Sequence, residues 1–200
     1  MKSTVILDTD GVIFEPIKGK IKDAAIKKYG RIKGLVLVAC YNLGVAKQFV
    51  ADKMADVVYD CAVQAKPMPG ALDALKELIE MPGVRVHVCT NVVYPGWRTR
   101  LSQEYRAKYE EMQGIKKFKM LSPSETKREY LNYATDQAHA SNRRVFVVDS
   151  KPENLALVNS RRVNPVLIST DAKDISCAAR GACAASFTSL GFFKAYMAQR

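Results

Sequence analysis

Short apolar runs, separated by polar and turn-forming residues, recur along this chain. Runs of this length are typical of strands that are buried in a sheet. Longer stretches with a different, helical spacing of apolar residues lie between several of them. The runs that predict strands are Val5–Leu7, Val84–Cys89, Phe118–Leu121, Val145–Val148 and Val166–Ile168.

The clearest helical pattern runs from Ala71 to Glu80, where leucine and isoleucine fall on one face and Pro82-Gly83 follows. Prolines and glycines just outside a periodic segment are typical of helix ends. Further helices are predicted over Trp97–Met112, over Glu125–Ala140 and from near Ser189 onward. Alternating strands and helices indicate an α/β fold, a Rossmann-like parallel sheet with helices on both faces.

One segment interrupts the alternation of strands and helices. Between Phe14 and Lys66 the pattern is mainly helical, apart from the apolar run Leu35–Ala39. We interpret residues 15–66 as an inserted cap, with residues 1–14 and 67–200 forming the core. A cap beside the sheet edge would act as a lid that excludes water and selects substrate. The alternative is a long connection without a functional role.

Composition and charge narrow the class of protein. The chain has 200 residues, of which 48% are hydrophobic, enough for one domain with a small insertion. The net charge of +11 favours anionic partners: phosphorylated metabolites, nucleic acid or an acidic protein. The alternative is that the positive charge serves solubility alone. A concentration of basic residues lies in the predicted cap: Lys18, Lys20, Lys22, Lys27, Lys28, Arg31 and Lys33.

Two further features bear on the location of the protein. No apolar run approaches the roughly 20 residues that a membrane span needs, and the chain starts directly with a strand, so we expect neither membrane insertion nor a signal peptide. The five cysteines form no CxxC pair. They are typical of reduced thiols, which predicts a cytoplasmic protein.

The most informative motif is Asp8-Thr9-Asp10-Gly11, directly after the first strand. Alternation along a strand would point both carboxylates the same way, where they repel each other unless a cation or a shared proton compensates. Gly11 allows a sharp turn. Open α/β sheets bind ligands at this edge. The alternative is a solvated strand end with an Asp-Gly turn.

Polar residues follow other predicted strands as well. Thr90 and Asn91 follow one of them, and Asp149 follows another. Because the carboxyl ends of parallel strands share one edge, Asp149 should lie near Asp8 and Asp10. Three carboxylates together favour Mg²⁺, which prefers oxygen ligands.

In this order, Asp8-Thr9-Asp10-Gly11, Thr90, Lys127 and Asp149 resemble the motifs of haloacid dehalogenase-like phosphohydrolases. A narrower resemblance is to 5′(3′)-deoxyribonucleotidases, in the segments Pro67–Leu75 and Val86–Asn91. That family usually has a serine where this chain has Asn91, and a second acid where it has Ser150. Glu153 or Asn154 would then take the place of the second acid.

The resemblance implies a role for each motif residue. Mg²⁺ would be held by Asp8, Asp10 and Asp149, with Asp10 contributing its backbone carbonyl. Asp8 would attack phosphorus and form an aspartyl-phosphate, and Asp10 would donate and accept protons. Thr90, Asn91 and Lys127 would bind the phosphate oxygens. Aromatic candidates for stacking a nucleobase, or else for simple packing, are Phe14, Tyr41, Phe49 and Trp97.

The expected function is therefore a Mg²⁺-dependent phosphomonoesterase that acts on (deoxy)nucleoside monophosphates, which are small-molecule partners. A phosphatase for polynucleotide ends is an alternative that the basic cap favours, since the charge makes nucleic acid a possible partner. A non-catalytic module that binds nucleic acid or protein is another. The sequence leaves the oligomeric state, the base and the position of the phosphate open.

Overall fold

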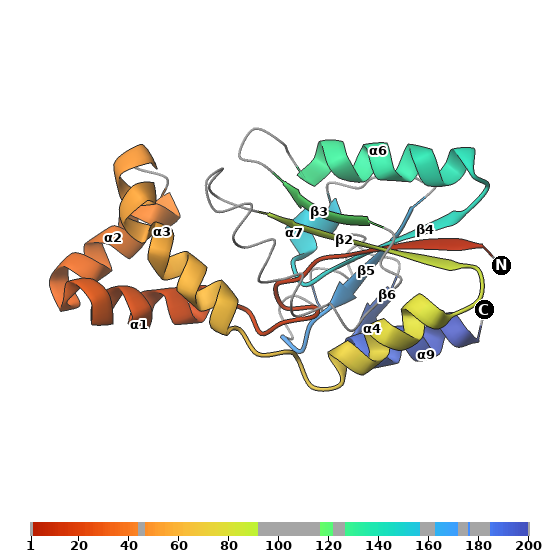
Figure 1. The fold of residues 1–200 in the computed structure, drawn as a ribbon, viewed down its shortest axis with the longest axis horizontal. Coiled ribbons are helices and arrows are strands. Elements are labelled where there is room, and N and C mark those ends of the chain that lie inside the picture. Colours follow the sequence, from red (N-terminus) through yellow and green to blue (C-terminus); the bar gives the residue numbers. More distant parts are fainter. Residues whose placement is uncertain are drawn as a thin grey trace.

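The computed structural model describes residues 2–43, 47–91, 117–121, 127–156, 163–171, 176 and 185–199. Its centre is a sheet of six parallel strands in the order β3-β2-β1-β4-β5-β6 (Figure 1). The strands are β1 (Ser3–Leu7), β2 (Val84–Asn91), β3 (Lys117–Leu121), β4 (Arg144–Asp149), β5 (Val163–Ile168) and β6 (Ala185–Phe187).

Helices cover both faces of this sheet, which confirms the predicted fold class. Figure 1 shows α6 (Lys127–Ala140) on one face, and α4 (Ala71–Glu80) and α9 (Leu190–Ala198) on the other. The short α7 (Pro152–Ala156) follows β4. The alternation of strand side chains divides the core accordingly, because Val5 and Leu7 pack with residues of α4 and α9, whereas Ile6 packs with residues of α6.

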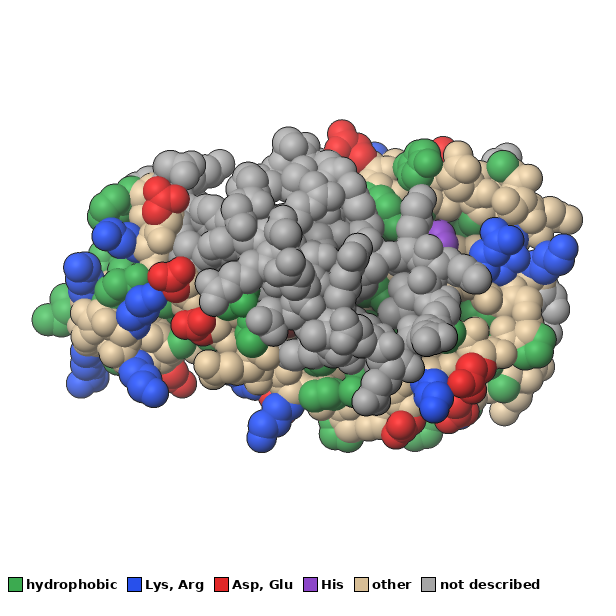
Figure 2. Space-filling model, viewed as in Figure 1, with side chains coloured by type: hydrophobic (Ala, Val, Ile, Leu, Met, Phe, Trp, Pro, Cys, Tyr) green, Lys and Arg blue, Asp and Glu red, His purple; other side chains and the backbone are tan. Residues whose placement is uncertain are grey.

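The segment after β1 forms a separate bundle of α1 (Lys18–Tyr29), α2 (Arg31–Leu43) and α3 (Lys47–Gln64). Ile21, Leu37 and Met54 belong to its own apolar core. The bundle lies beyond the edge at which the strands end (Figure 1). Basic side chains are spread over it on the face in Figure 2, and the exposed ones on α1 and α2 include Lys20, Lys22, Lys27, Lys28, Arg31 and Lys33.

The chain segments that leave and re-enter the core lie side by side. Phe14 and Pro67 form an antiparallel bridge. The Glu15 N–H donates to the Lys66 carbonyl at 2.8 Å, and the Met68 N–H donates to the Ile13 carbonyl at 2.9 Å. These bonds attach the bundle to the core at two adjacent points, directly after β1.

The structure corrects several details of the sequence interpretation. The apolar run Leu35–Ala39 belongs to α2, because Leu37 packs into the core of the cap. β5 begins at Val163, and β6 was not predicted, since three residues are too few to show a pattern. The helix predicted over 97–112 lies outside the described residues. Within the described part of the chain, no helix is both long and apolar enough to cross a membrane.

Candidate active site

Asp8 stands where β1 gives way to a tight turn. The strand ends at Leu7, and the Asp8 N–H donates to the Val148 carbonyl of β4 at 2.9 Å. The Ile13 and Phe14 N–H groups both donate to the Thr9 carbonyl, at 3.0 and 2.9 Å. Because the strand has already ended, turn geometry and not strand alternation sets the relation between the carboxylates of this motif.

Lys127 links two carboxylates at the sheet edge. Its Nζ lies 3.1 Å from Asp8 Oδ1 and also donates to Asp149 Oδ2. Asp8 comes from the end of β1, Asp149 from the end of β4 and Lys127 from the start of α6. All three side chains are buried, with 6%, 0% and 8% of the residue exposed for Asp8, Asp149 and Lys127. Three residues that the sequence analysis selected thus form one buried ionic cluster.

Burial controls the charge of this cluster. It raises the pKa of Asp8 to about 6, with the charge of Asp149 acting in the same direction and Lys127 opposing both. Burial alone would lower the pKa of Lys127, but the charges of Asp8 and Asp149 outweigh it and raise that pKa above its ordinary value. Lys127 therefore remains an ammonium, and one ammonium does not fully compensate two carboxylates.

Asp149 has further partners that fix its orientation. The Lys151 N–H donates to Asp149 Oδ1 at 2.9 Å, and Asn154 Nδ2 lies 3.1 Å from each of the two carboxylate oxygens. Asn154 lies on α7, the helix that follows this turn. Of the two residues expected to substitute for a second acid, Asn154 contacts Asp149, whereas Glu153 is exposed.

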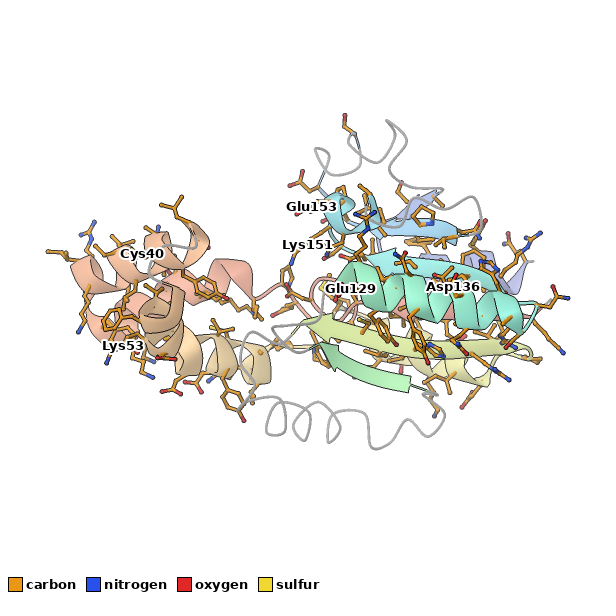
Figure 3. All side chains as sticks on the ribbon, turned by 90° about the horizontal axis from the view of Figure 1, so that it is seen from above. Cys40, Lys53, Glu129, Asp136, Lys151 and Glu153 are labelled. Atoms are coloured by element: carbon orange, nitrogen blue, oxygen red, sulfur yellow. The ribbon has the colours of Figure 1, made fainter. Side chains whose placement is uncertain are left out.

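Asp10 is held by the cap and by the turn after β4. Its Oδ1 accepts from the N–H of Ile17, the residue before α1, at 2.9 Å, and Lys151 Nζ lies 3.6 Å from Oδ2. The Asp10 backbone carbonyl accepts from Ser150 Oγ at 2.7 Å. Figure 3 shows Lys151 at the end of the core that faces the cap. Sequence reasoning missed the contacts of Ile17, Ser150 and Lys151.

The donor chemistry fits a hard cation such as Mg²⁺. No group of three acidic, histidine or cysteine side chains within the described ranges could hold a metal ion by itself. The donors at the edge are instead two carboxylates, Asp8 and Asp149, and the backbone carbonyl of Asp10, all of which are oxygen ligands. Burial and the charge of Asp149 both raise the pKa of Asp8, and a cation at this position would act in the opposite direction and favour its ionised form.

Of the predicted phosphate-binding residues Thr90 and Asn91, the structure describes the backbone. Thr90 and Asn91 end β2, in register with Met120 and Leu121 of β3, so their backbone lies at the same sheet edge. Their side chains, like all of Trp97, lie outside the described residues.

The three aromatic candidates that the structure describes lie in different surroundings. Phe14 is only 2% exposed and packs in the main core, so the candidate role in stacking a nucleobase is wrong and the alternative, simple packing, is confirmed. Tyr41 is half-buried against the core of the cap. Phe49 is 61% exposed, with Lys53 Nζ 5.9 Å from the centre of its ring.

Comparison with known proteins identifies the fold. No family model and no curated protein sequence matches the chain. Among solved structures, it resembles a haloacid dehalogenase-like hydrolase from Burkholderia xenovorans with a TM-score of 0.71 and 14% identity, covering 100% of this chain and 98% of that one. A protein assigned as a β-phosphoglucomutase from Thermotoga maritima matches with a TM-score of 0.66 and 13% identity, over 98% and 99% of the chains.

A third similar structure is the D,D-heptose 1,7-bisphosphate phosphatase from B. bronchiseptica, in complex with magnesium and phosphate. Its TM-score is 0.57 at 17% identity, over 100% of this chain and 99% of that one. The chain therefore has the fold of haloacid dehalogenase-like hydrolases. These comparisons give no support to the narrower resemblance to 5′(3′)-deoxyribonucleotidases.

Proposed function

We propose that this protein is a Mg²⁺-dependent phosphomonoesterase whose nucleophile is Asp8 and whose preferred substrates are nucleoside monophosphates. The observation that carries the proposal is the buried cluster in which Lys127 joins Asp8 and Asp149 at the carboxyl edge of the sheet. Magnesium and phosphate bound to the heptose bisphosphate phosphatase of the same fold support the reaction class.

The residues divide the chemistry among them. Asp8 attacks phosphorus and becomes phosphorylated, while Asp10 gives a proton to the leaving oxygen and then takes one from the attacking water. Lys127 binds phosphate oxygens, and Thr90 and Asn91 would add donors at the end of β2. Held by Asp8, Asp149 and the Asp10 carbonyl, Mg²⁺ would neutralise the charge that otherwise repels a phosphate dianion from a carboxylate.

The cap supports a substrate with a sizeable leaving group. The cap begins beside Asp10, the residue that would protonate the leaving oxygen, because the N–H of Ile17, directly before α1, donates to Asp10 Oδ1 at 2.9 Å. Closing over the sheet edge, the cap would act as a lid that contacts the part of the substrate beyond the phosphate. The preference for nucleotides rests on the resemblance of Pro67–Leu75 and Val86–Asn91 to deoxyribonucleotidases.

The test is a phosphate-release screen of ribo- and deoxyribonucleoside monophosphates, both 5′ and 3′, with added Mg²⁺. A small ester such as p-nitrophenyl phosphate serves as the generic substrate. We expect release from both classes by the natural protein and by the exposed control variant Asp136→Asn, and none by Asp8→Asn. Activity of Asp8→Asn above a tenth of the natural rate would reject the nucleophile.

A polynucleotide end is the second candidate substrate, because exposed lysines and Arg31 concentrate on α1 and α2. Binding to phosphates through such residues weakens steeply with salt. A gel shift of end-phosphorylated oligonucleotides at low and high salt, combined with release of their terminal phosphate, would favour this substrate. Binding to oligonucleotides without hydrolysis of any ester would favour the non-catalytic alternative.

A further inference from the structure

Ser150 contacts the backbone of Asp10 and not its carboxylate. Ser150 Oγ donates to the Asp10 carbonyl at 2.7 Å. On the other side of the same peptide group, the Gly11 N–H donates to the Phe14 carbonyl at 2.8 Å. The peptide between Asp10 and Gly11 is therefore held from both sides, although it lies beyond the end of β1, where strand pairing no longer fixes the chain.

Gly11 makes this contact possible. A Cβ at this position would lie 2.6 Å from Ser150 Oγ and 2.7 Å from Ser150 Cβ, closer than real Cβ contacts allow. Its φ of +78° also lies in the region that favours glycine. The glycine of the motif thus serves two purposes, since it makes the turn and lets Ser150 approach the carbonyl of Asp10.

The hydroxyl connects Asp10 to the rigid part of the molecule. Ser150 directly follows β4, and β4 pairs with β1 up to Leu7 and Val148. The carboxylate of Asp10 has its own contacts with the Ile17 N–H and with Lys151. With the backbone held by Ser150 and the side chain by these groups, the carboxylate has a defined position relative to Asp8.

We propose that Ser150 is a positioning residue, whose hydroxyl holds the Asp10 carbonyl and so places the Asp10 carboxyl for proton transfer to the leaving oxygen. This inference rests on the proposed phosphatase function. The 5′(3′)-deoxyribonucleotidases, which two segments of this chain resemble, usually carry a second acid where this chain has Ser150. An ionised carboxylate there has no proton to donate to a carbonyl oxygen, so the serine allows a contact that the acid would not.

The proposal predicts a dependence on the leaving group. In the first step the bond between Asp8 and phosphorus forms, the ester P–O bond breaks, and the proton of Asp10 moves to the departing oxygen. An alkyl oxygen needs this proton, whereas p-nitrophenolate leaves readily without it. Misplacing Asp10 should therefore slow hydrolysis of alkyl phosphates and largely spare p-nitrophenyl phosphate.

The experiment compares kcat/KM of the natural protein, Ser150→Ala and Ser150→Thr on p-nitrophenyl phosphate and on an alkyl ester, glycerol 2-phosphate. Ser141→Ala is the matched control, because Ser141 Oγ also donates to a backbone carbonyl, that of Gln137 at 3.1 Å, on an exposed surface. We expect Ser150→Ala to lose about tenfold to a hundredfold on the alkyl ester and less than about threefold on the nitrophenyl ester.

Ser150→Thr keeps a hydroxyl and should restore most of the loss, while Ser141→Ala should behave like the natural protein. Thermal unfolding of each variant separates positioning from folding. Equal losses on both esters, no loss on either, or recovery of Ser150→Ala at saturating Mg²⁺ would overturn the positioning role. If the natural protein hydrolyses neither ester with Mg²⁺ present, the proposed function itself fails.

Discussion

Replacing Asp8 with asparagine should abolish turnover and yet stabilise the metal-free protein. The pKa of Asp8 is about 6 in the folded state, against 3.8 as its ordinary value. Because the folded pKa is the higher one, the favourable contribution of Asp8 to folding is complete below about pH 3.8 and is lost as the pH rises through about 6. Above that range the folded protein carries a buried charge that it accommodates poorly.

The size of the effect follows from the two pKa values. One pKa unit corresponds to about 1.4 kcal/mol, so the separation between 3.8 and about 6 is worth about 3 kcal/mol of unfolding free energy. Asparagine removes the charge and keeps the shape of the side chain. For a chain of this size, about 3 kcal/mol corresponds to an increase of roughly 6–12 °C in Tm.

Urea unfolding in excess chelator, at about pH 4 and about pH 8, measures this prediction. The unfolding free energy of Asp8→Asn should exceed that of the natural protein by about 3 kcal/mol at the higher pH and match it closely at the lower pH. Asp136→Asn, an exposed change on α6 (Figure 3), should differ by less than about 0.5 kcal/mol at both. A destabilised Asp8→Asn protein at pH 8, or a difference that does not change with pH, would refute the reasoning.

Three further predictions concern the buried ion pair, the packing of the cap and the metal. Lys127→Met leaves two buried carboxylates uncompensated and should cost about 3–5 kcal/mol in urea unfolding, whereas the half-exposed Lys151→Met should cost less than about 1 kcal/mol. Gly34→Ala places a Cβ 2.7 Å from the Ala25 carbonyl oxygen and should lower the protection of the cap in hydrogen exchange by about 1–3 kcal/mol. The control Gly19→Ala has open space around its Cβ and should raise this protection, because alanine favours helix more than glycine does. Chelator should remove phosphatase activity, Mg²⁺ should restore it and Ca²⁺ should not, because Ca²⁺ takes more ligands at longer distances; full activity in chelator would contradict this.

The sequence predicted those parts of the site that depend on the sheet. Asp8 and Asp149 follow apolar runs that form neighbouring strands, and parallel strands bring their carboxyl ends to one edge. Lys127 was selected by its order in the motif, and the structure places it between the two carboxylates. Residues that directly follow parallel strands are predictable, because the strands bring all of them to the same edge of the sheet.

The remaining contacts depend on turns, for which the sequence offers no comparable rule. The bond from Ser150 to the Asp10 carbonyl requires a particular path of the chain after β1 and another after β4. Phe14 had two expected roles, stacking on a substrate or packing, and it packs in the core because the turn after Asp10 brings the chain back against the sheet. The apolar run Leu35–Ala39 was ambiguous for another reason, since short apolar runs are compatible with buried helices and buried strands.

The two aspartates of the motif are fixed by different parts of the molecule. Asp8 is held by a backbone bond to β4 and by Lys127, both of which belong to the core. The carboxylate of Asp10 accepts from Ile17, directly before the first helix of the cap, and its carbonyl accepts from Ser150 of the core. The carboxylate of Asp10 is therefore in direct contact with the cap, whereas the contacts named for Asp8 come from the core. In the proposed reaction the nucleophile would thus be held by the core, whereas the acid–base residue would be held by the cap through Ile17 and by the core through Ser150.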